Sequence, residues 1–138
     1  MGEYIVDKIR KNFEDMIKRE ETELKDDMEH ITANIRIHLP FRAESAYIAS
    51  YKIATYKTIL EELLDALTIQ EIESVLSKYI AEYTARLTKG CLVQSSTQMM
   101  HNLCSLWISK ANQDLLERFE TQYKFAVKNN KAYKNESE

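Results

Sequence analysis

The sequence has very little glycine and proline. Its 138 residues include two Gly and one Pro, where average usage gives about ten and about seven. Folds built from sheets need these residues in their turns, so a β architecture has almost no turn signals here. Hydrophobic residues make up 44% of the chain and charged residues 30%, which is typical of a folded domain. The composition therefore predicts an all-α protein with one hydrophobic core.

The sequence also lacks long apolar segments, an excess of basic residues and metal-ligand motifs, and each absence argues against a location or a class of ligand. No apolar run approaches the roughly 18 residues that cross a bilayer, and the N-terminus lacks the apolar core of a signal peptide. A net charge of −3 gives no basic field for nucleic acid. Cys91 and Cys104 have no metal-ligand spacing and are expected to be free thiols. We therefore expect a cytoplasmic protein without membrane segment, metal or cofactor.

Apolar residues recur at intervals of three and four along most of the chain, which predicts four amphipathic helices. They are expected over residues 3–38, 42–66 and 68–89, and from about 95 to 128. The polar segment 129–138 is expected to be a flexible tail. Residues 1–128 then form a single domain, an elongated up-down four-helix bundle.

Local signals place the helix boundaries. Pro40 is expected to end the first helix, because proline lacks an N–H and disfavours helix in the preceding residue. Thr68 and Glu71 have the spacing of a capping box, and Leu67 and Ile72 that of a hydrophobic staple. Gly90 is expected to cap the third helix. The alternative is a continuous helix over 42–89, which gives three long helices intertwined in a dimer.

The predicted lengths leave two helix ends without neighbours. The first and fourth helices, at about 35 residues, should be about 50 Å long, and the middle two about 30–40 Å. The start of the first and the end of the fourth share one pole of the bundle, so they should meet there in a coiled-coil-like stalk. The apolar residues expected in this stalk are Ile5, Ile9, Phe13, Met16, Leu115, Phe119 and Tyr123.

A stalk of two helices buries too little apolar area to be stable alone. We therefore expect a second subunit or a partner protein to cover it, and a homodimer is the specific prediction. The alternative is that one of the long helices kinks and folds back over the apolar face.

Candidate catalytic chemistry is weak throughout the chain. The carboxylate pairs Glu20/Glu23 and Glu62/Asp65 have the helical spacing seen in magnesium-binding nucleotide hydrolases, but a proline turn separates them. The hydroxyls of 95–97 near His101 lack an oxyanion-hole loop and are better explained as a helix cap. We therefore assign no catalytic and no metal-binding residue.

One cluster mixes aromatic and basic side chains on the predicted second helix. Such interleaving can stack bases and hold phosphates, although tyrosines at this spacing more often pack at the edge of a core. The residues of this cluster are Arg42, Tyr47, Tyr51, Lys52, Tyr56 and Lys57.

The prediction that follows is a non-enzymatic protein-protein interaction module. It would be a small helical regulator, adaptor or inhibitor, of the kind common among phage and viral accessory proteins, with an unidentified protein partner. Nucleic-acid or nucleotide binding through the aromatic-basic cluster is the alternative and is not favoured. A magnesium-dependent nucleotide hydrolase is the second alternative.

Overall fold

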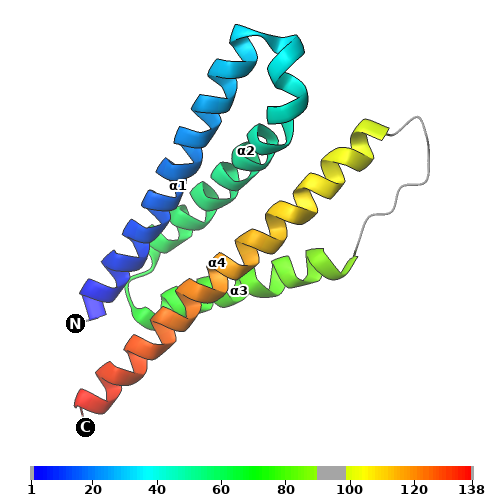
Figure 1. Ribbon diagram of the computed structural model, residues 1–138. Helices are drawn as coiled ribbons and strands as arrows, with labels where there is room; N and C mark the ends of the chain where they lie inside the picture. Colours follow the sequence, from blue (N-terminus) through cyan, green and yellow to red (C-terminus); the bar gives the residue numbers. More distant parts are fainter. Residues whose placement is uncertain (1, 90–98, 138) are drawn as a thin grey trace.

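The computed structural model describes residues 2–89 and 99–137. Over these residues the chain forms four α-helices and no strand: α1 (Gly2–Ala33), α2 (Ile35–Asp65), α3 (Ile69–Lys89) and α4 (Met99–Ser137) (Figure 1). The predicted all-α four-helix bundle is confirmed. Among the described helices, none is both long enough and apolar enough to cross a bilayer.

The helices pack as two pairs, α1 with α2 and α3 with α4. The start of α1 and the end of α4 lie at the same end of the molecule, and the turn between α1 and α2 lies at the opposite end (Figure 1). With its 39 residues, α4 is about 58 Å long, so the bundle is elongated. The α1–α2 turn therefore projects far from the chain ends.

All four helices meet around the side chain of Phe119. Its ring stacks on Phe13 of α1 at a centroid distance of 6.4 Å and meets Tyr56 of α2 edge-on at 6.5 Å. Tyr79 and Tyr83 of α3 pack edge-on against it at 6.3 and 5.3 Å. Offset and edge-to-face aromatic pairs of this kind add to the stabilisation from burial. Phe119 is therefore the centre of the core.

The predicted stalk is wrong. Ile9, Phe13, Leu115 and Phe119 are completely buried within one chain, and Ile5 and Met16 are 8% and 7% exposed. Tyr123 is half-buried and packs against the same core. The cover comes from the end of α2 and the start of α3, whose core residues reach this pole. Apolar periodicity defines the buried face of a helix but does not say which neighbour covers it.

The first helix boundary also differs from the prediction. Pro40 does not end a helix; it lies inside α2, as its sixth residue. The break is at Asn34, whose backbone is extended and whose side chain accepts a hydrogen bond from the Ile37 amide at 3.3 Å. The His38 amide already bonds to the Asn34 carbonyl, so Pro40 lies within the hydrogen-bonded part of the helix. It lacks the N–H that would bond to the Arg36 carbonyl, and the helix continues across this one missing bond. The N-cap, and not the proline, determines where the chain turns.

The boundary between α2 and α3 is confirmed, and the alternative of one continuous helix over 42–89 is wrong. The Glu71 amide donates to Thr68 Oγ1 at 3.2 Å, as a capping box requires. The Glu71 carboxylate accepts from the Leu67 amide at 2.8 Å, one residue before the expected donor. The predicted hydrophobic staple is wrong, because Leu67 is 78% exposed while Ile72 is fully buried.

Helix α4 continues past residue 128 to Ser137. The flexibility expected of 129–138, and the domain boundary at 128, stay predictions. The expected cap at Gly90, the Cys91 thiol and the hydroxyls of 95–97 lie outside the described residues. For His101 only the backbone is described, within α4.

Candidate functional site

Large apolar side chains are exposed at the α1–α2 turn. They come from the last turns of α1 and the first turns of α2. We call this group the tip patch: Met28 (46% exposed), Ile35 (58%), Ile37 (56%), Leu39 (43%) and Phe41 (84%). Single exposed apolar residues are normal on a protein surface, but five within 14 residues at one end of the molecule are a candidate interaction site.

The spacing of these residues explains why they stay exposed. From residue 35 to residue 41 every second residue is large and apolar: Ile35, Ile37, Leu39 and Phe41. On a helix, residues four apart share a face, so Ile35 and Leu39 lie on one side and Ile37 and Phe41 on another. One neighbouring helix cannot cover both sides. The start of α2 is therefore apolar on two faces, and neither is buried.

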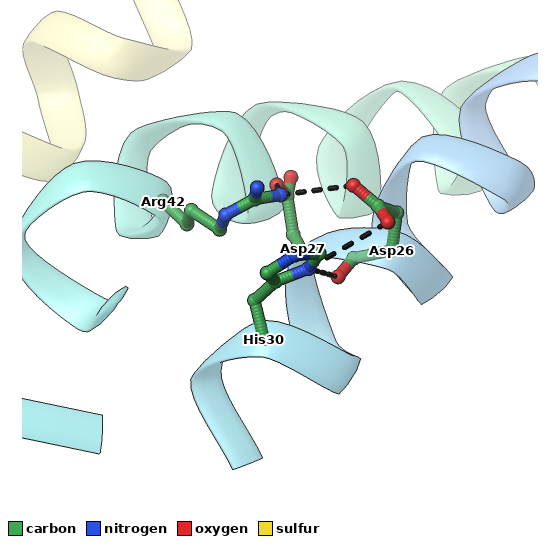
Figure 2. Close-up of polar contacts among 4 residues, drawn as sticks. All are labelled: Asp26, Asp27, His30 and Arg42. Atoms are coloured by element: carbon green, nitrogen blue, oxygen red, sulfur yellow. Dashed lines mark hydrogen bonds and ion pairs between the residues drawn. The ribbon is translucent and has the colours of Figure 1, made fainter. Parts of the chain in front are cut away.

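A polar network holds the two helices together directly beside the tip patch. Arg42 Nη1 of α2 donates to Asp26 Oδ2 at 2.9 Å and to Asp27 Oδ1 at 3.1 Å, both on α1 (Figure 2). His30 Nδ1 lies 2.8 Å from the Asp26 carbonyl oxygen and 3.6 Å from its carboxylate. The hydrogen bond to Asp26 raises the pKa of Arg42 above its ordinary value. The network fixes the angle at which α2 leaves the turn.

Asp27 is the most constrained member of this network. Its side chain is 8% exposed, and within the described part of the chain its Oδ2 has no hydrogen-bond partner. A buried carboxylate is tolerated only when a cation compensates it. Arg42 is that cation, so losing Arg42 would leave Asp27 buried without its counter-ion.

An acidic groove runs between α1 and α2 beside the tip patch. It has a volume of about 340 Å³ and is lined by Glu20 and Glu23 of α1 and by Phe41, Glu44 and Ile48 of α2. Burial raises the pKa of Glu20, and the neighbouring Glu23 carboxylate raises it further, against the opposing effect of Lys52. The groove therefore combines the apolar side chains of Phe41 and Ile48 with carboxylates, of which Glu20 and Glu23 repel one another.

Lys52 closes one end of this groove and is 8% exposed. Its ammonium lies 3.9 Å from Glu20 Oε1 and donates a hydrogen bond to the Asp114 carboxylate of α4. This one cation therefore joins three helices. It is a structural ion, because its charge is already matched by two carboxylates.

The predicted aromatic-basic cluster does not form one face. Tyr56 is buried in the core, where desolvation raises its pKa above the ordinary value. The Tyr51 hydroxyl donates to Asn112 Oδ1 at 2.7 Å and accepts from Arg86 Nη1 at 2.9 Å. The ring of Tyr47 contacts Trp107 at a centroid distance of 5.6 Å.

The cations of that cluster are separated in the same way. Arg42 and Lys52 are engaged by carboxylates, in the network and the groove described above, and Lys57 is exposed on the surface of α2. Phosphate binding needs cations that are available on a common surface. The cluster thus lacks the basic face on which the nucleic-acid prediction relied.

The two carboxylate pairs face different surroundings. Glu62 forms an ion pair with Lys78 of α3, and this hydrogen bond lowers the pKa of Glu62. Glu20 instead faces Lys52 in the acidic groove. Over residues whose side chains the structure describes, no three His, Cys, Asp or Glu side chains form a group that could hold a metal ion.

Comparison of the chain with protein-family models, with curated proteins and with solved structures found no match. The function must therefore be argued from this chain's own surface. The tip patch was not predicted, because the first helix was expected to continue to residue 38 and to end at Pro40, whereas α2 begins at Ile35. The signal that could have revealed it is the alternating apolar run before Phe41, which no single helix face can bury.

Proposed function

We propose that the chain is a non-enzymatic protein-interaction module that binds its partner through the tip patch. The observation that carries the proposal is the exposure of five large apolar side chains within 14 residues, at the far end of a bundle whose core is complete without them. A small helical regulator, adaptor or inhibitor needs one such surface on a rigid support.

The tip patch is energetically suited to this role. Burying a large aliphatic or aromatic side chain stabilises by about 1.5–3 kcal/mol. A partner that covers Phe41 and its neighbours would recover this energy, against the loss of translational and rotational freedom on association. The Arg42 network holds the start of α2 in place beforehand, which lowers the entropy lost on binding.

Affinity capture from the source cell tests the proposal if it compares two double variants. Ile37→Ser with Phe41→Ser removes apolar area from the tip patch. Leu64→Ser with Leu67→Ser is the matched control, because these residues are also exposed (53% and 78%) but lie around the α2–α3 boundary.

We expect the wild-type chain and the control to retain the same protein and the tip variant to lose it. All three proteins should unfold at similar temperatures, because none of the four residues contributes to the core. Equal capture by the tip variant, or loss in the control alone, would refute the proposal.

A further inference from the structure

The acidic groove follows one face of α2. Six residues of α2 line it, and four of them are spaced by four, three and four positions: Phe41, Ser45, Ile48 and Lys52. These spacings place them on one face of α2, over a length of about 17 Å. This corresponds to about three helical turns, which is long enough for an amphipathic helix to dock alongside α2.

The lining of the groove is acidic. It carries three carboxylates, Glu20, Glu23 and Glu44, against the one ammonium of Lys52, a net charge of −2. Glu20 and Glu23 line one wall and Glu44 the other. Two of these carboxylates are engaged, Glu44 by Lys110 at 2.7 Å and Glu20 by Lys52 at 3.9 Å. Glu23 is exposed beside them.

We infer that the acidic groove, together with Phe41 of the tip patch, binds an amphipathic helix of a partner protein, with apolar side chains on one face and Lys or Arg along its edges. The inference rests on the proposed function and names the chemistry of its partner. The apolar face would cover Phe41 and Ile48, and a cation would approach the exposed Glu23.

Charge complementarity distinguishes this occupant from a second copy of the chain. Two copies that met at their grooves would bring one lining with a net charge of −2 against another, and like charges placed together across an interface oppose binding. A cation beside Glu20 and Glu23 would instead relieve the repulsion between them. The groove therefore favours a partner of opposite charge.

Fluorescence anisotropy with three labelled helical peptides tests this inference. The first peptide has leucines at intervals of three and four residues along one helical face and lysines along both edges of that face. The second keeps the leucines and has glutamates in place of the lysines, and the third keeps the lysines and has alanines in place of the leucines. We expect the first peptide to bind at least about tenfold more tightly than either of the others.

Variants of the chain show where the peptide binds. Phe41→Ser should abolish binding of the first peptide, while Leu67→Ser should leave it unchanged. Glu23→Lys should weaken it about threefold, as expected for one exposed charge. Glu61→Lys is the matched control, because it reverses the charge of another exposed glutamate outside the groove and should have less effect.

The outcomes separate this inference from the proposed function. If the leucine–glutamate peptide binds as tightly as the leucine–lysine peptide, the charge of the partner is wrong while an apolar docking surface stands. If binding survives Phe41→Ser, or if no peptide binds, the groove is not the site, and the capture experiment alone decides the proposed function.

Discussion

At the scale of single residues, Phe41 and Phe119 show that two residues of the same type can have different roles. Phe119 is fully buried and contacts aromatic rings from the other three helices, whereas Phe41 is 84% exposed. The fold depends on Phe119. Phe41 has no stabilising role in the free chain, which is why we connect it with binding.

Replacing each of these phenylalanines with alanine should therefore separate stability from binding. Phe119→Ala should lower the free energy of unfolding by about 3–5 kcal/mol, through lost burial and the cavity left behind. Phe41→Ala should change it by less than about 0.5 kcal/mol. Urea denaturation followed by circular dichroism measures both. A large loss of stability in Phe41→Ala would show that the tip patch belongs to the core.

Lys52 is the second residue whose placement makes a specific prediction. Lys52→Met leaves Glu20 and Asp114 without their shared cation. We expect a loss of about 2–3 kcal/mol in the free energy of unfolding, below the 3–5 kcal/mol typical of a broken buried pair. The reason is that the Asp114 side chain is 38% exposed, so water partly solvates its charge.

Lys57→Met is the matched control, because Lys57 lies on the same helix and is exposed. Its stability should stay within about 0.5 kcal/mol of the wild type. Equal effects of the two substitutions in urea denaturation would mean that Lys52 does not act as the joint between α1, α2 and α4.

At the scale of helices, the sequence predicted one boundary and missed another. The capping residues Thr68 and Glu71 lie within four consecutive positions, so the start of α3 could be predicted from the local sequence. The end of α1 was missed because Pro40 was treated as a stop signal. The actual signal, Asn34, is the same kind of cap, but it stands within an apolar pattern that continues smoothly across it.

The N-cap interpretation of Asn34 can be tested directly. Asn34→Ala removes the acceptor for the Ile37 amide and should lower the free energy of unfolding by about 1 kcal/mol. Asn34→Asp keeps a capping oxygen and should stay near the wild-type value. Thermal unfolding of the two variants side by side checks this. Equal stability of Asn34→Ala and Asn34→Asp would show that the Asn34 cap does not determine where α2 begins.

At the scale of the whole molecule, helical periodicity predicted the buried faces but not their neighbours. Ile9 and Phe13 were correctly expected on an apolar face, yet the sequence could not show that α2 and α3 extend far enough to cover them. The homodimer stays a prediction. The uncovered apolar stalk from which it was inferred is buried within one chain. The exposed apolar residues of the tip patch lie at the opposite end, on the α1–α2 turn.

The candidate site could not be predicted for a related reason. Whether an apolar residue is exposed depends on which helices pack over it, and tertiary packing decides that. The acidic character of residues 20–44 was visible in the sequence, but its position beside Phe41 and Ile48 was not. Helix pairing brings the charge and the apolar surface together.

Site-specific photo-crosslinking in the source cell tests the central claim most directly. A photoreactive phenylalanine analogue is placed at residue 41, in the tip patch, and in a separate protein at residue 67 as the exposed control. We predict that position 41 yields a covalent adduct with one defined protein other than this chain, and that position 67 does not. The absence of an adduct from position 41, or the same adduct from both positions, would contradict the account.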